Sequence, residues 1–185
     1  MRVFSVVFAS LLLAVVAVAQ APPPRPAPKV VPGAPIGTLA QVMRGVFFPN
    51  ANLIFDVQQI DPAAPRKKPV EGGGGGATAD FSNVYTGWQV VENAAISLNE
   101  AVDLILKSGR FCDNGKPAPV QRADFQKFAQ GLRDASRKAL VAAQAKNQEK
   151  VSDVANDLAD ACANCHEVYR DKGDAKSPLR CVASK

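Results

Sequence analysis

Histidine, methionine and tryptophan are scarce in this 185-residue chain, which contains one His, two Met and one Trp. It also lacks the paired-carboxylate, Ser/His and phosphate-loop arrangements that predict an enzyme, since the glycines at 72–76 have neither the Lys nor the strand context of a phosphate loop. Lys and Arg outnumber Asp and Glu by only 22 to 17 and are scattered, which gives little support to nucleic-acid binding. We therefore expect neither an enzyme nor a nucleic-acid-binding protein.

The N-terminal segment 1–19 has the composition of a secretory signal peptide. One Arg stands beside the start, a short apolar stretch follows, and Ala17 and Ala19 have the A-x-A spacing of a cleavage site. A transmembrane anchor is the alternative, but the stretch is short and has no stop-transfer flank. It is also the only long apolar run without charge, so no internal segment is available to span a membrane. We expect an exported, periplasmic protein without stable membrane insertion.

Two segments are predicted to lie outside the folded part. Residues 20–35 contain seven prolines, which remove backbone N–H donors and favour an extended, disordered lead-in. Residues 61–80 contain a basic run and the glycines 72–76, and they can bury too little apolar surface to order themselves, so they should form a flexible linker. The folded part is therefore expected within 36–173, with 174–185 as a C-terminal tail.

Apolar residues within 36–173 recur at steps of three and four, which is the α-helical period, and no run of strict alternation predicts a strand. The sequence therefore predicts an all-α protein. The first helical stretch runs from Ile36 to Val57 and contains Pro49. Because proline has no N–H and its ring clashes with the preceding turn, we expect this helix to kink or split near Phe48.

Three further amphipathic stretches follow. The second covers 81–105, with Gly109 as the predicted residue just past its end. The third covers 125–143, and the fourth covers about 148–172. Four helices of similar length with a short third connection indicate an antiparallel four-helix bundle.

The string CANCH at 162–166 matches the C-x-x-C-H pattern of covalent haem attachment. On a helix, Cys162, Cys165 and His166 share one face, so two thioether bonds could hold one haem c per chain near one end of the bundle while the imidazole binds the iron. Two alternatives remain. One is a redox disulfide within the C-x-x-C, and the other is a zinc site that also recruits Cys112 and Cys181.

The string CANCHEVYR, from Cys162 to Arg170, resembles the class II c-type cytochromes, the cytochrome c′ family of four-helix bundles. In that family the motif lies near the C-terminus on the last helix, and here 19 residues follow His166. The resemblance implies that His166 is the proximal iron ligand and that Arg170 lies near it. The alternative for Arg170 is a solvated cation near a helix C-terminus. No Met follows His166, which excludes the small cytochromes that use a downstream Met ligand.

The resemblance also implies that the distal residue comes from the first helix, as Met in some members and as an apolar residue beside an open position in others. In an up-and-down bundle Met43 lies at nearly the same level as His166, so Met43 is the candidate distal iron ligand, with core packing as its alternative role. Trp88 falls at the opposite end. The same reasoning places six apolar residues around the haem: Leu39, Leu98, Val102, Ile105, Phe125 and Phe128.

The remaining two cysteines are predicted to pair with each other. Cys112 lies in the loop after the second helix and Cys181 in the tail after the fourth, and both ends lie on the same side of the bundle. Exported chains rarely leave two thiols free, so we expect a disulfide between Cys112 and Cys181 that pins the tail beside the haem edge.

Together these features predict an exported electron carrier whose partners are other exported redox proteins. If Met43 does not reach the iron, the open position would instead bind a diatomic gas such as NO or CO. A third reading is a bundle without haem whose cysteines form only disulfides. Members of this fold often pair through their first helices, so the resemblance includes a homodimer among the partners.

Overall fold

The computed structural model describes residues 33–65, 85–170, 174 and 176–182. This part of the chain is helical and contains no strand beyond one isolated β-bridge between Phe111 and Pro117. The predicted all-α fold is therefore confirmed. The elements in chain order are α1 (Leu39–Val42), η1 (Met43–Phe47), α2 (Phe48–Phe55), η2 (Asp56–Gln58), α4 (Trp88–Ile105), α5 (Ala123–Gln144) and α6 (Gln148–Tyr169).

Several predicted segments lie outside the described residues. They are the signal peptide 1–19, the lead-in up to residue 32, the linker from residue 66, the helical positions Phe81 and Val84, and the last three residues of the tail.

The first helical run starts with a sequence-encoded cap. The Thr38 hydroxyl accepts a hydrogen bond from the Gln41 N–H at 3.2 Å, and the Thr38 N–H donates to the Gln41 side-chain oxygen at 2.8 Å. This reciprocal pair of hydrogen bonds satisfies the backbone N–H groups of Thr38 and Gln41 at the helix start. The run then continues to Gln58 and buries one apolar face, which consists of Leu39, Phe47, Ala51, Ile54 and Val57.

Pro49 lies inside this run, for which the sequence predicts a kink or a split near Phe48. The run is not split, but it departs from the regular α-helix directly before Pro49. Directly before it, η1 is a π-helix of five residues, and the Phe48 N–H donates to the Met43 carbonyl five residues back. Pro49 cannot donate to its own preceding turn, and the wider π-helical turn accommodates that missing bond. The chain thus remains helical on both sides of Pro49.

α4 ends at Ile105, the last residue of the predicted stretch, but its C-cap is Leu106, so Gly109 is not the residue just past the helix end. The cause is Arg110, a buried residue whose guanidinium donates hydrogen bonds to the carbonyls of Leu104 at 2.7 Å and Gly37 at 2.6 Å. These bonds draw the chain into a loop, in which Gly109 adopts a left-handed φ of 80°. Arg110 therefore ties the end of α4 to the start of the first helical run.

α5 and α6 follow the predicted periodicity. Their connection is marked by Asn147, whose side chain accepts from the Lys150 N–H at 2.9 Å and caps α6, and by Lys146 with a left-handed φ of 51°. α6 runs to Tyr169, and the predicted helical positions 171 and 172 lie outside the described residues. The buried residues of the two helices include the predicted Phe125, Leu132, Ala135, Ala139, Ala143, Val151 and Leu158.

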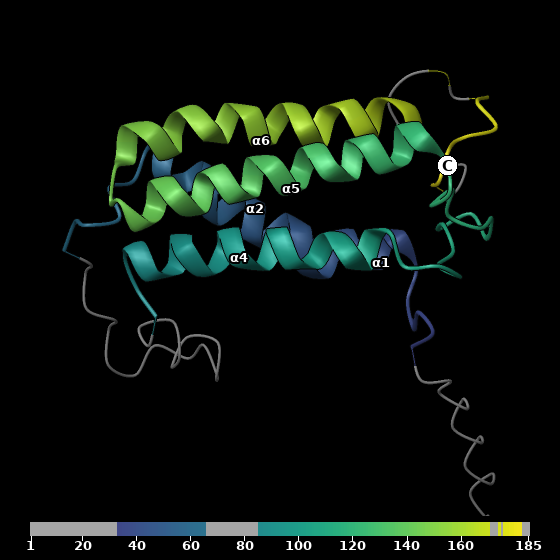
Figure 1. The fold of residues 1–185 in the computed structure, drawn as a ribbon, viewed down its shortest axis with the longest axis horizontal. Coiled ribbons are helices and arrows are strands. Elements are labelled where there is room, and N and C mark those ends of the chain that lie inside the picture. The colour runs from purple at the N-terminus through teal and green to yellow at the C-terminus, as the bar shows by residue number, and fades with distance from the viewer. Residues whose placement is uncertain (1–32, 66–84, 171–173, 175, 183–185) are drawn as a thin grey trace, which may run out of the picture.

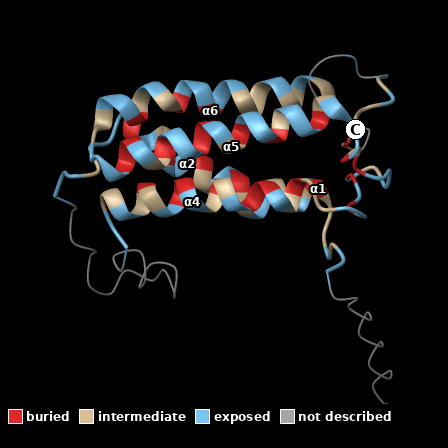
Figure 2. Ribbon diagram, in the orientation of Figure 1, coloured by how far each residue is buried: buried red, intermediate tan, exposed pale blue. Residues whose placement is uncertain are grey.

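The helices lie side by side as a bundle (Figure 1). α5 packs against α4 and α6, and α2 also packs against α4 and α6, so the four helical runs surround one core. Buried residues face the inside of this bundle, as Figure 2 shows. Among the described helices, none combines the length and the apolar character needed to cross a membrane.

Candidate functional site

A cavity of about 1150 Å³ lies between the first helical run, α4, α5 and α6. It is at the end of the bundle where the C-terminal residues lie (Figure 1). Most of its lining side chains are apolar, and the loop at Asp113 and the tail at 180–182 complete one side. Small-molecule sites have volumes of roughly 300–1,000 Å³, so this cavity is large enough for a sizeable planar ligand.

The C-x-x-C-H residues line this cavity from the last turns of α6. Cys162, Cys165 and His166 all contribute to its wall, as the helical spacing predicts, because residues three and four apart share a face. All three side chains are partly buried. The structure thus brings two thiols and the chain's single imidazole to one wall of a single apolar cavity.

The two cavity thiols are not set up as a reactive dithiol. Burial raises the pKa of the Cys162 thiol, and burial together with the neighbouring Cys162 raises the pKa of Cys165 to about 12. Redox-active C-x-x-C pairs instead have a thiol whose pKa is lowered by a positive charge or a helix N-terminus. The surroundings of these thiols therefore give no support to a redox disulfide at this motif.

Five of the six residues predicted for the haem wall line the cavity, and one does not. The five are Leu39, Leu98, Ile105, Phe125 and Phe128. Val102 is fully buried but lies outside the cavity lining. A helix turns about 100° per residue, so Val102 is displaced by about 40° around α4 from Leu98. The prediction located the correct level of the bundle but could not resolve this rotation.

Met43 lines the same cavity from the first helical run, at the start of η1. Two buried apolar residues of that run, Leu39 and Phe47, flank it in the lining. The structure therefore brings the predicted distal residue and His166 into one cavity, from helices that are more than one hundred residues apart in sequence.

Three arginines and one carboxylate belong to the cavity lining. Arg170 lies just past the end of α6 and donates its backbone N–H to the His166 carbonyl at 3.1 Å. Arg44 is exposed and lies 3.8 Å from Asp113, and Arg180 contributes from the tail. The cavity is thus apolar inside, and its charged lining residues carry a net positive charge.

The tail is held against the cavity by a disulfide between Cys112 and Cys181, as predicted. Their Cα atoms are 4.7 Å apart, and both side chains are buried. The Cys181 N–H donates to the Tyr169 carbonyl at 2.7 Å, and its carbonyl accepts from the Asp113 N–H at 2.9 Å. The Asn114 side chain donates to the Arg180 carbonyl at 2.6 Å.

This pairing argues against the zinc alternative. Cys112 and Cys181 are bonded to each other, so neither is available as a thiolate ligand beside Cys162 and Cys165. Among the described residues, no group of three or more His, Cys, Asp and Glu side chains is placed to hold a metal ion.

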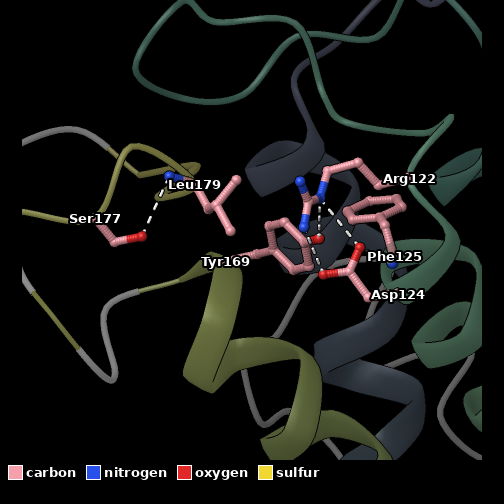
Figure 3. Close-up of polar contacts among 6 residues, drawn as sticks. All are labelled: Arg122, Asp124, Phe125, Tyr169, Ser177 and Leu179. Carbon is pink, nitrogen blue, oxygen red and sulfur yellow. Dashed lines mark hydrogen bonds and ion pairs between the residues drawn. The ribbon is translucent and has the colours of Figure 1, made fainter.

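A polar cluster at the edge of the cavity was missed by sequence reasoning (Figure 3). The buried Tyr169 ring lines the cavity and packs edge-on against Phe125 and Phe128, with ring centroids 5.1 and 6.3 Å away. Arg122 donates to the Tyr169 hydroxyl at 3.1 Å and to the Asp124 carboxylate at 3.0–3.1 Å. The hydroxyl of a buried tyrosine is thereby satisfied.

This cluster has shifted acid–base properties. The hydrogen bond from Arg122 lowers the pKa of Asp124 to about 2, and burial raises the pKa of Tyr169. The sequence showed Tyr169 only as one residue of the buried face of the fourth helix. Arg122 is the residue before α5, and Asp124 lies in the first turn of that helix. No local sequence pattern links either of them to Tyr169, which is 47 residues from Arg122.

Comparisons with protein families, with curated proteins and with solved structures find no match to this chain.

Proposed function

We propose that this protein is an exported c-type cytochrome of the cytochrome c′ kind, which carries one covalent haem and transfers electrons between exported redox partners. The observation that carries the proposal is the meeting of Cys162, Cys165 and His166 on one wall of a large apolar cavity. The helices would be arranged as an antiparallel bundle, which the three-residue connection between α5 and α6 supports.

The residues present fit a haem. The cavity is large and apolar, as a porphyrin ring requires, and the thiols and imidazole have the helical spacing of the attachment motif. A haem also has two carboxylates on one edge. Arg44, Arg170 and Arg180 outnumber the single carboxylate of Asp113 in the lining, so the cavity offers charge that complements that edge.

Each side chain has a defined role in this proposal. Cys162 and Cys165 would form the two thioethers, His166 would bind the iron on one side, and Met43 is the candidate ligand on the other. When bound, haem supplies a one-electron couple at iron. The surrounding helices would exclude water from it, and the tail held by the Cys112–Cys181 disulfide would cover one edge. No acid–base group is needed for this function.

Binding of a diatomic gas is the second candidate. It is favoured by the two apolar residues beside Met43, since Leu39 and Phe47 would wall an open iron position if the thioether did not occupy it. A methionine ligand would raise the potential and favour electron transfer, so the ligation of Met43 decides between the two functions.

Export to the periplasm is part of the proposal. It is supported by the signal-like segment 1–19 and by the Cys112–Cys181 disulfide, since disulfides persist mainly in oxidising compartments.

The first test is covalent haem attachment. The full chain is expressed with a haem-attachment system and analysed by mass spectrometry and by haem staining of a denaturing gel. The unmodified chain should carry one haem, and Cys162→Ser together with Cys165→Ser should carry none. Asn164→Ala, an exposed change inside the motif that keeps its spacing, is the matched control and should still carry haem. A chain that leaves this system without covalent haem would refute the proposal.

The second test separates the two functions. Absorption spectra of the oxidised and reduced protein are recorded with and without CO. A low-spin spectrum that depends on Met43, is lost in Met43→Ala and responds little to CO supports electron transfer. A high-spin spectrum that shifts readily with CO in the unmodified protein supports gas binding. Leu53→Ala, an exposed change on the same helical run, is the control and should leave the spectrum unchanged.

A further inference from the structure

The first helical run contacts the cavity in a pattern that an ordinary α-helix does not produce. Its lining residues come in pairs four residues apart: Leu39 and Ala40, Met43 and Arg44, Phe47 and Phe48, Ala51 and Asn52, and then Phe55. An α-helix turns about 100° per residue, so each step of four passes a full turn by about 40°. Over the four steps from 39 to 55, the stripe would drift by about 160°, almost to the opposite side of the helix.

The π-helix η1 removes part of this drift. In Met43–Phe47 the Phe48 N–H reaches the Met43 carbonyl five residues back, so this turn contains one extra residue. One extra residue shifts the angular register by about 100° relative to an uninterrupted α-helix. With this turn in place, residues on both sides of it can line the same cavity.

The cause of the π-helix is local and lies in Pro49. Proline has no N–H to donate to the residue four before it, Gly45, and its ring would clash with that carbonyl in a regular α-helix. Two side chains beside it bond to other carbonyls of the run. Asn50 donates to the Val46 carbonyl at 2.8 Å, and Asn52 donates to the Phe48 carbonyl at 2.7 Å.

The start of the run is fixed independently of Pro49. The Leu39 N–H donates to the Phe111 carbonyl at 2.8 Å, and Arg110 holds the Gly37 carbonyl at 2.6 Å. Ile54 and Val57, near the other end, are fully or almost fully buried in the core. Both ends of the run are therefore held against the bundle, and the turn between them determines which side chains face the cavity.

We propose that Pro49 is a positioning residue, which by fixing the π-helix over Met43–Phe47 holds the Met43 thioether over the cavity opposite the C-x-x-C-H wall; the inference builds on the proposed haem function. Pro49 is exposed and does not line the cavity. It acts on the site only through the register of its helix. This role holds whether Met43 binds the iron or packs beside an open position.

The test uses the ¹H and ¹³C signals of the Met43 methyl group in the haem-loaded full chain. Samples are reduced and saturated with CO, so that the iron is diamagnetic in every variant. A methyl group held over the porphyrin is shifted strongly upfield by the ring current. The unmodified chain should show this shift. Pro49→Ala should lose most of it if Ile54 and Val57 keep the far half of the run in the core, because a regular α-helix then turns Met43 by about 100° and breaks the bond from the Leu39 N–H to the Phe111 carbonyl. Gly45→Ala is the matched control in the same π-helical turn, with open space for the added methyl, and should keep the shift.

A rescue variant separates register from general damage. Deletion of Gly45 in the Pro49→Ala background removes the extra residue and should return Met43 to the cavity side, together with its upfield shift. An unchanged shift in Pro49→Ala overturns the inference. So does a shift that is lost in Pro49→Ala and not restored by the deletion, because the loss would then come from misfolding rather than register.

The inference can fail separately from the proposed function. If the unmodified chain attaches no haem, the proposed haem function is refuted. The same variants are then compared in the haem-free chain, by nuclear Overhauser contacts from the Met43 methyl group to the side chains that line the cavity. These contacts should be present in the unmodified chain, lost in Pro49→Ala and restored by the Gly45 deletion. Contacts that persist in Pro49→Ala would overturn the positioning role there too.

Discussion

The two halves of α5 show how differently the two ends of the bundle are packed. The first half lines the cavity with Phe125, Phe128, Ala129 and Leu132. The second half presents small residues to the core, and these are almost completely buried: Ala135, Ser136, Ala139, Ala142 and Ala143. One continuous helix therefore borders a large cavity at one end and a closely packed core at the other.

The contrast between the two halves of α5 indicates that the cavity follows from the choice of side chains on this helix. Protein interiors are normally packed to the density of organic crystals, and apolar cavities destabilise a fold. Small residues in the second half of α5 let the neighbouring helices approach, whereas large residues in the first half surround open space. In the proposed function, the haem would supply packing contacts to these large side chains.

The largest predicted effect comes from removing the disulfide, which acts only at the cavity end. Replacing Cys112 and Cys181 by Ala should lower the free energy of unfolding of the full chain by about 4 kcal/mol, because a crosslink over 69 residues restricts the unfolded chain. Urea denaturation measures this. Amide hydrogen exchange should quicken most in the loop at 110–114 and at Tyr169. Equal quickening at the alanine-rich end would contradict the division into two ends.

The second effect compares one substitution at two places on α5. Ala139→Leu adds volume to the closely packed half and should cost about 1–3 kcal/mol of unfolding free energy. Ala129→Leu should cost less in the haem-free chain, because the longer side chain can extend into the cavity it already lines. The same change should reduce the fraction of chains that acquire haem. Thermal and urea denaturation of both variants decides the comparison, and equal costs would show that the two halves are packed alike.

A smaller effect is expected at the α5–α6 connection, far from the cavity. Asn147→Ala removes the cap on the Lys150 N–H and should lower the unfolding free energy by about 1 kcal/mol. Asn147→Asp keeps an oxygen acceptor and should retain most of that stability. Haem content should be unchanged in both variants. A loss of haem in Asn147→Ala would mean that the two ends are more tightly coupled than their packing suggests.

The smallest effect is the acid sensitivity of the cavity edge. The pKa of Asp124 is lowered to about 2 by Arg122, so its carboxylate stabilises the fold above its ordinary pKa near 4. That contribution is lost as the pH falls from about 4 to about 2. Asp124→Asn should therefore flatten the fall in melting temperature over this range. Asp153→Asn, which changes an exposed acid on α6, is the control. If it reduced the pH dependence of the melting temperature as much as Asp124→Asn, the bond between Arg122 and Asp124 would not be the cause.

Much of this architecture was predictable because it depends on local patterns. The faces of α5 and α6 follow from apolar residues at helical spacing, and C-x-x-C-H on a helix is enough to gather Cys162, Cys165 and His166. The disulfide followed from the two bundle ends that carry Cys112 and Cys181. Each of these inferences needs only helical geometry and chain order.

The predictions that failed depend on contacts between distant segments. The end of α4 is set by the bond from Arg110 to Gly37, 73 residues away, and the Tyr169 cluster joins residues 47 apart. Val102 was placed at the right level but on the wrong part of its helix surface. At Pro49 the sequence predicted a kink or a split, whereas the structure has a π-helical turn that accommodates the same missing hydrogen bond.

The separate burial of the two cysteine pairs has a consequence for the maturation of the protein. In the structure Cys112 is bonded to Cys181, and Cys162 and Cys165 are free thiols. Once formed, the Cys112–Cys181 bond is buried, whereas the cavity thiols stay partly exposed. In the proposed function Cys162 and Cys165 must remain thiols until haem is attached. A mild reductant should therefore keep these two cysteines reduced without opening the buried Cys112–Cys181 bond.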